Sequence, residues 1–160
     1  MEAIIRWIDI VSPTLQAIHR DWLRLRVGIM VSVRDYNSFA TSPNSEAVAG
    51  ETLYVTIAAD DGSATLRYAG KNLAGIVPEC RPGMNLIEIR SPVERSAFVQ
   101  PFFDVRSSRQ PECRRGMNRR DGDGSRYEVL MLPFADAATN VRLIHAVYDP
   151  GSLKRSTVQL

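Results

Sequence analysis

The sequence has few of the residues on which catalytic and metal sites are most often built. Its two cysteines, Cys80 and Cys113, lack the spacing of a metal site, which fits a reducing compartment. Its two histidines, His19 and His145, lie far apart in the chain, and no nucleophile with a base or paired carboxylates accompanies them. We therefore expect no enzyme, no catalytic residue and no metal site.

Long apolar runs and a large excess of one charge are also absent. No stretch is long and apolar enough to span a bilayer. Residues 1–11 lack the clean apolar region and the small-residue cleavage site of a signal peptide. The formal charge of +2 is too small to indicate a polyanionic partner, and no nucleic-acid-binding module is recognisable. We expect a cytoplasmic protein with no membrane span and no nucleic-acid partner.

What the sequence does contain is a strongly apolar C-terminal half. The length of 160 residues and a hydrophobic content of 44% suit one domain with a real core. Residues 111–150 predict three consecutive strands, with a hairpin turn at Asp121 to Gly124. In the strand at residues 126–134, Tyr127, Val129 and Met131 share one face and Leu130, Leu132 and Phe134 the other. Because both faces are apolar, we expect layers on both sides of the sheet.

Two amphipathic helices are predicted to supply those layers. Ser12 and Pro13 indicate a helix start, and the helix at residues 14–26 carries the apolar stripe Leu15, Ile18, Trp22 and Leu25. The stripe fits packing on the chain's own sheet, which we favour, or the seam of a homodimer. Ser91 begins a second helix, and Pro101 predicts a kink or a late start.

The segment between these helices predicts a β-hairpin and shorter pieces. Residues 53–59 and 65–70 are rich in strand-forming residues and flank a loop at residues 60–63. Residues 71–91 contain several glycines and prolines, which are typical of single helical turns. Residues 30–33 are a candidate for an extended run, and the pattern assigns no structure to the rest of residues 29–50.

In the order of these elements the chain resembles the stand-alone PAS proteins of alphaproteobacteria that are catalogued as PAS family 5. The resemblance is carried by Trp22, Arg26, Gly28, Arg34-Asp35-Tyr36, Arg67-Tyr68-Ala69-Gly70, Gly75, Gly83, Pro111, Asp121 to Gly124, Leu130-Met131-Leu132-Pro133 and Tyr148-Asp149-Pro150. The sequence departs from the family's usual pattern at Val31, where members have proline, and in the small, polar loop before the first strand of the hairpin.

The resemblance implies an α+β PAS fold at residues 12–150, after an extension at 1–11 and before a flexible tail at 151–160. It implies a five-stranded antiparallel sheet in the order 2-1-5-4-3, with short helices on one face and the N-terminal helix on the other. It also implies a non-catalytic sensory or regulatory module in bacterial signalling, which binds another signalling protein. A homodimer through the N-terminal helix is one form that such a module can take. The alternative is a sensor whose cavity binds a small molecule, such as a nucleotide or another anionic or apolar ligand.

Four side chains are candidates for lining such a cavity. His145 lies in the middle of a strand, and strand alternation predicts that its side chain faces the cavity. We favour a core histidine with its hydrogen bonds satisfied over a histidine that contacts a ligand. Tyr68 and Tyr127 are expected to alternate onto the same side, and Met131 is expected to fill part of the space.

Flavin and haem are both disfavoured as cofactors. Cys80 precedes an arginine, as the reactive cysteine of light-sensing flavin PAS domains does. Those domains surround the cysteine with asparagine and glutamine residues that hold the flavin ring, whereas here Pro82 and Gly83 follow. The helix at residues 91–110 has no histidine that could ligate haem iron.

The strand before the hairpin turn is rich in arginine, at Arg114, Arg115, Arg119 and Arg120. An arginine pair with the spacing of Arg115 and Arg119 occurs in cyclic-dinucleotide binders. Those proteins also have a downstream Asp/Asn-x-Ser-x-x-Gly strand, which this sequence lacks. We favour an edge strand that its charge keeps soluble, and a docking edge for an acidic protein is a further reading. The only lysines are Lys71 and Lys154, a bias that genomic composition explains as well as anion recognition does.

Overall fold

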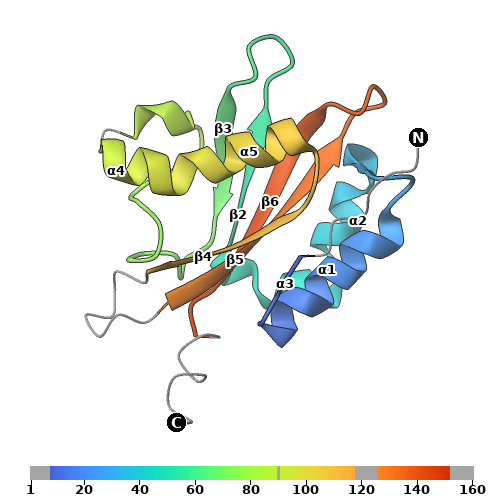
Figure 1. Ribbon diagram of the computed structural model, residues 1–160, viewed down its shortest axis with the longest axis horizontal. Coiled ribbons are helices and arrows are strands. Elements are labelled where there is room, and N and C mark those ends of the chain that lie inside the picture. Colours follow the sequence, from blue (N-terminus) through green and yellow to red (C-terminus); the bar gives the residue numbers. More distant parts are fainter. Residues whose placement is uncertain (1–7, 90, 118–125, 152–160) are drawn as a thin grey trace.

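The computed structural model describes residues 8–89, 91–117 and 126–151, and it consists of one β-sheet with helices against both faces (Figure 1). The five long strands are β2 (Thr52–Ile57), β3 (Ala64–Ala69), β4 (Glu112–Met117), β5 (Arg126–Ala135) and β6 (Val141–Asp149). They pair antiparallel in the order β3-β2-β6-β5-β4. This is the predicted order 2-1-5-4-3, so the chain has a PAS-type α+β fold.

A further, short strand lies within residues 30–33, the run that was a candidate for extended structure. The two-residue strand β1 (Val31–Ser32) pairs in parallel with Phe134 and Ala135 at the end of β5. β1 and β4 pair with the same edge of β5. The pairing with β4 ends at Met131, and β1 pairs with the residues beyond it. Two residues are too few to show an alternating pattern, which explains why the sequence indicated an extended run here but no pairing partner.

Between these two partners, the edge of β5 is completed by a side chain. Pro133 has no N–H to donate, and its carbonyl oxygen accepts a hydrogen bond of 3.0 Å from Nε1 of Trp22. Trp22 is buried in the helix layer over this face of the sheet. The interruption of the ladder therefore leaves no unsatisfied carbonyl at this point.

The alternating faces of β5 separate two apolar cores. Val129 and Met131 pack on the side of the second helix layer, whereas Leu130, Leu132 and Phe134 pack against the N-terminal helices. All five side chains are buried, with no more than 4% of their surface exposed. The prediction that β5 is covered on both faces is confirmed.

The N-terminal layer contains α1 (Pro13–Leu25), the 3-10 turn η1 (Val33–Asp35), α2 (Tyr36–Ala40), α3 (Pro43–Ala47) and the 3-10 turn η2 (Ala49–Glu51). The predicted cap is present, because the Ser12 hydroxyl accepts a hydrogen bond of 3.1 Å from the backbone N–H of Leu15.

The apolar stripe of α1 packs on its own sheet. Leu15, Ile18 and Trp22 are at most 1% exposed, and Leu25 is half-buried against the same core. The packing that was favoured for this stripe is therefore confirmed, and a homodimer through α1 stays a prediction.

The second layer contains the 3-10 turn η3 (Leu86–Glu88), α4 (Pro92–Glu94), a π-helical turn η4 (Arg95–Val99) and α5 (Gln100–Ser108). The Ser91 hydroxyl caps α4 by accepting from the N–H of Glu94. The helical run starts at Pro92 and not later, and Pro101 lies in the first turn of α5, directly after the π-helical turn that interrupts the run. Of the single helical turns predicted for residues 71–91, the described part forms only η3.

Candidate functional site

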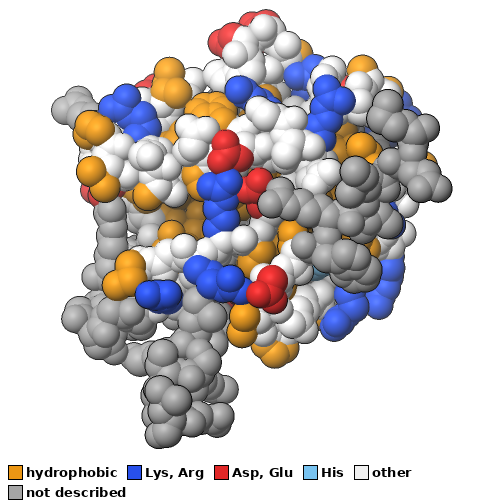
Figure 2. All heavy atoms as spheres, in the orientation of Figure 1, with side chains coloured by type: hydrophobic (Ala, Val, Ile, Leu, Met, Phe, Trp, Pro, Cys, Tyr) orange, Lys and Arg blue, Asp and Glu red, His pale blue; other side chains and the backbone are white. Residues whose placement is uncertain are grey.

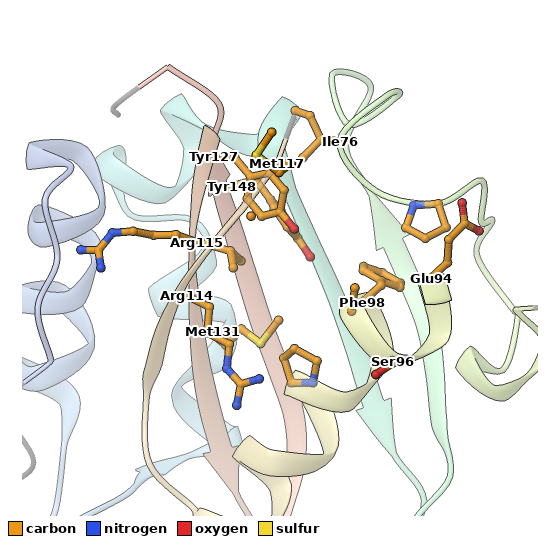
Figure 3. A pocket seen from close by; sticks show the side chains of 15 residues that line it. Ile76, Glu94, Ser96, Phe98, Arg114, Arg115, Met117, Tyr127, Met131 and Tyr148 are labelled. Carbon is orange, nitrogen blue, oxygen red and sulfur yellow. The ribbon is translucent and has the colours of Figure 1, made fainter. Parts of the chain in front are cut away.

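A pocket lies between the α4–α5 layer and the β4–β5 edge of the sheet, with a volume of about 450 Å³ (Figure 3). Its apolar wall includes Ile76, Phe98, Pro101, Met117, Val129 and Met131. Its polar wall includes Glu94, Ser96, Arg114, Arg115, Tyr127 and Tyr148. The volume falls in the range of small-molecule sites, and the mixture of an apolar lining with a few polar groups is typical of them.

The two tyrosines of the wall are positioned by the sheet. Tyr127 pairs directly with Gly116 of β4, and its ring covers this glycine so closely that a Cβ there would collide with the ring. Tyr148 of β6 packs edge-on against Tyr127, with ring centroids 5.5 Å apart. Burial raises the pKa of Tyr148 well above its usual value, so this phenol is neutral. The pair therefore presents aromatic rings and uncharged hydroxyls.

Arg114 lines the pocket but is held by two carboxylates. Its guanidinium lies 2.7 Å from Asp104 of α5 and 2.6 Å from Glu112 of its own strand. Hydrogen bonds from Gln100 and then from Arg114 lower the pKa of the Asp104 carboxyl. Figure 2 shows acidic and basic side chains in contact with one another on this face, with apolar surface next to them.

Arg115 directs its guanidinium away from the pocket, as Figure 3 shows. It lies 3.2 Å from the carboxylate of Glu128 and donates to the backbone carbonyl of Asp9. Both described arginines of the predicted basic edge are thus paired with acidic groups of the chain. Arg119, Arg120 and the turn at residues 121–124 lie outside the described residues.

Of the four predicted cavity residues, Tyr127 and Met131 line the pocket. Tyr68 does not, and the expectation that it shares a side with Tyr127 is wrong. The register between β2 and β3 shifts by one residue: Val55 pairs with Leu66, but Tyr54 pairs with Tyr68. The extra residue, Arg67, moves Tyr68 to the other face, where it stacks on Tyr54 and donates to the carbonyl of Ala49.

His145 also lies on the face opposite the pocket, so its predicted orientation is wrong. It pairs with Leu132, and the face of β6 that meets the pocket carries Tyr148 instead. Its Nδ1 is 2.9 Å from the hydroxyl of Tyr36, and Phe39 packs edge-on against its ring. Burial lowers the pKa of His145 to about 3. His145 is therefore a neutral core histidine, as its lone position favoured, but only Nδ1 is satisfied, because the buried Nε2 has no hydrogen-bond partner among the described residues.

A buried carboxylate that sequence reasoning missed fastens the start of α1. Glu128 is fully buried on the face of β5 shared with Leu130, and it accepts hydrogen bonds from the backbone N–H groups of Val11 (3.0 Å) and Ser12 (2.8 Å). The Ser12 hydroxyl donates to Asp149 at 2.6 Å. The available signal was an acidic residue on an otherwise apolar strand face. These contacts place the end of the predicted extension, residues 8–11, against the sheet.

The cysteines show no sign of activation. Burial raises the pKa of Cys80, and burial together with the neighbouring Glu128 raises that of Cys113 to about 12, so both thiols are protonated at neutral pH. Within residues 8–89, 91–117 and 126–151, no three His, Cys, Asp or Glu side chains gather as metal ligands. In the same ranges no helix is both long and apolar enough to cross a bilayer.

Comparison with known proteins finds no matching family model and no matching curated protein. Among solved structures, the chain is similar to a fungal LOV domain photoreceptor (15% identity, TM-score 0.44, covering 87% of this chain and 94% of that one). It is also similar to an RNA-binding light-oxygen-voltage receptor (16% identity, TM-score 0.47, covering 84% of this chain and 38% of that one). LOV domains are a subfamily of PAS domains. Likeness at this level transfers neither ligand nor activity to the chain.

Proposed function

We propose that this protein is a non-catalytic sensory module that takes a small molecule into the pocket between α5 and β4 and passes the signal to another protein by contact. The observation that carries the proposal is the pocket itself, a space of about 450 Å³ lined by aromatic and sulfur-containing side chains. The space opens to the surface between the helix layer and the sheet edge, so a small molecule can enter it without disturbing the core. The PAS-type sheet supplies the frame, and the ligand acts on the helix layer that closes over it.

The absence of catalysis is part of the proposal. Its support is that the polar groups of the wall do not form a reactive set: Ser96 is exposed on the π-helical turn, and the nearest described thiol, Cys80, is protonated. Neither histidine lines the pocket, because His19 stacks on Trp22 of α1 and His145 packs under α2. A haem ligated by histidine in this pocket is therefore disfavoured.

Native mass spectrometry of the purified protein tests the proposal, both as isolated and after incubation with a set of small aromatic compounds. We expect the wild-type chain to carry a bound small-molecule mass. Ser96→Trp places an indole at the pocket wall from an exposed position, so it should remove that mass without disturbing the core.

The matched control is Ser107→Trp, which adds the same side chain to an exposed position of α5 outside the pocket and should keep the bound mass. Wild-type protein that shows only the mass of its own chain in both experiments contradicts the ligand-sensing function. A module that works by protein contact alone would then be the better account.

A further inference from the structure

The chemical class of the ligand can be inferred from the ion pairs that the charged side chains of the pocket wall already form. This step rests on the proposed function. An anionic ligand, such as a nucleotide or a carboxylic acid, is normally held by guanidinium groups that have no other partner. The described wall contains two arginines, so the question is whether either is free to act.

Arg114 is surrounded by more negative charge than it carries. Asp104 and Glu112 both lie within 2.7 Å of its guanidinium, which gives two carboxylates to one cation. Gln100 also donates to Asp104 and holds that carboxylate in place. An incoming anion would have to displace one of these groups and would meet a net negative cluster.

Arg115 forms its ion pair on the other face of the sheet. Its guanidinium contacts Glu128, whose carboxylate is fully buried and also binds the backbone at the start of α1. Withdrawing Arg115 towards the pocket would leave that buried charge without its cation, which is strongly unfavourable.

The remaining wall offers surfaces that suit flat, uncharged molecules. Phe98 and the Tyr127–Tyr148 pair present aromatic rings, and the thioether of Met131 lines the same pocket (Figure 3). Sulfur and ring edges pack favourably against an aromatic ligand. The tyrosine hydroxyls and Ser96 can exchange hydrogen bonds with a neutral polar group.

We propose that the pocket selects an uncharged aromatic ligand and rejects the anionic form of the same scaffold, with Asp104 and Glu112 as the residues that set this specificity by neutralising Arg114. They act through Arg114, and so they are positioning residues for the pocket's charge. Removing their charges converts the wall from anion-rejecting to anion-accepting.

Calorimetry with indole and indole-3-acetate tests this specificity, since the two probes share one ring system. Wild-type protein should bind indole at least about tenfold more tightly than indole-3-acetate, which corresponds to about 1.4 kcal/mol. In Asp104→Asn/Glu112→Gln, the affinity for indole-3-acetate should rise about tenfold or more while that for indole stays within about twofold.

Arg114→Gln is the matched variant of the same ion-pair cluster. It should leave indole binding unchanged and make indole-3-acetate binding no stronger, because it removes a cation that is already neutralised. Equal or tighter wild-type binding of indole-3-acetate, lost in Arg114→Gln, overturns the inference and leaves ligand sensing intact. Failure of both probes to bind the wild-type pocket counts against the proposed function instead.

Discussion

At the scale of single residues, two side chains of the N-terminal layer form hydrogen bonds with polar groups of the sheet strands. Trp22 completes the edge of β5 at Pro133, and Tyr36 bonds to His145. Both contacts lie in the N-terminal core, away from the pocket. Changes here should therefore act on stability and leave ligand binding unaffected.

Trp22→Phe should lower the free energy of unfolding by about 1–3 kcal/mol, because the carbonyl of Pro133 loses its donor while remaining buried. Urea unfolding followed by circular dichroism measures the change. Arg24→Gln, at a largely exposed position on the same helix, should change it by less than about 0.5 kcal/mol. A Trp22→Phe protein as stable as the wild type would show that the hydrogen bond contributes little.

His145 should make the protein lose stability on acidification. Its pKa is lowered from 6.5 to about 3 in the folded chain, so below pH 6.5 the unfolded state binds more protons than the folded state. The stabilising contribution of the neutral ring is therefore complete above pH 6.5 and is lost as the pH falls towards 3.

Between pH 6.5 and about 4, wild-type stability should fall more steeply than that of His145→Gln, by about 1.4 kcal/mol per pH unit. The glutamine can still pair with Tyr36 but does not titrate. Unfolding curves at a series of pH values give both slopes, and their difference removes the contribution of the carboxylates that both proteins share. Parallel slopes would mean that His145 titrates normally.

At the scale of elements, α1 depends on a polar anchor and the pocket wall depends on a glycine. Ser12 caps α1 and also donates to Asp149, while Glu128 binds the preceding backbone. On the pocket side, Gly116 gives Tyr127 the room to lie across β4. Ser12 is thus the residue to change for α1, and Gly116 is the residue to change for the pocket wall.

Ser12→Ala should destabilise the protein by about 1–2 kcal/mol, because the N-cap of α1 and the bond to Asp149 are lost together. Hydrogen exchange should show the loss first at the amides of α1. Thr14→Ala, two residues later and exposed, is the control and should leave both readouts within error. Unchanged α1 protection in Ser12→Ala would assign the anchoring to Glu128 alone.

Gly116→Ala should force the Tyr127 ring out of its position, since the added methyl would occupy the space of the ring. We expect weakened binding of any pocket ligand and lower stability. The double variant Gly116→Ala/Tyr127→Ala should recover the stability that the clash removes, which thermal unfolding of the set would reveal. If the single variant binds ligand as the wild type does, the position of Tyr127 does not shape the pocket.

At the scale of the whole molecule, the layers and most of the strands followed from the sequence, because apolar alternation and helix caps act locally. Ser12 and Ser91 marked helix starts, and the two apolar faces of β5 required cover on both sides. The strand order came from the resemblance to PAS domains, since periodicity does not determine which strands pair.

The parts that could not be predicted depend on tertiary contacts. The bulge at Arg67 reverses the side of Tyr68, and no local signal announces the extra residue. His145 lies on the same strand face as Leu143 and Val147, and alternation alone could not say which face of the strand meets the pocket. The partners of Arg114 lie on its own strand and on α5, so its charge balance emerges only in the fold.

The central claim, that a small molecule occupies the space between α5 and β4, is tested most directly by methyl NMR of the methionines during titration with indole. We predict saturable shifts of the Met131 and Met117 methyl signals, which line the pocket, with little change at Met30, which does not. Saturable shifts confined to Met30, or no saturable shift at Met131 up to millimolar indole, would contradict the account.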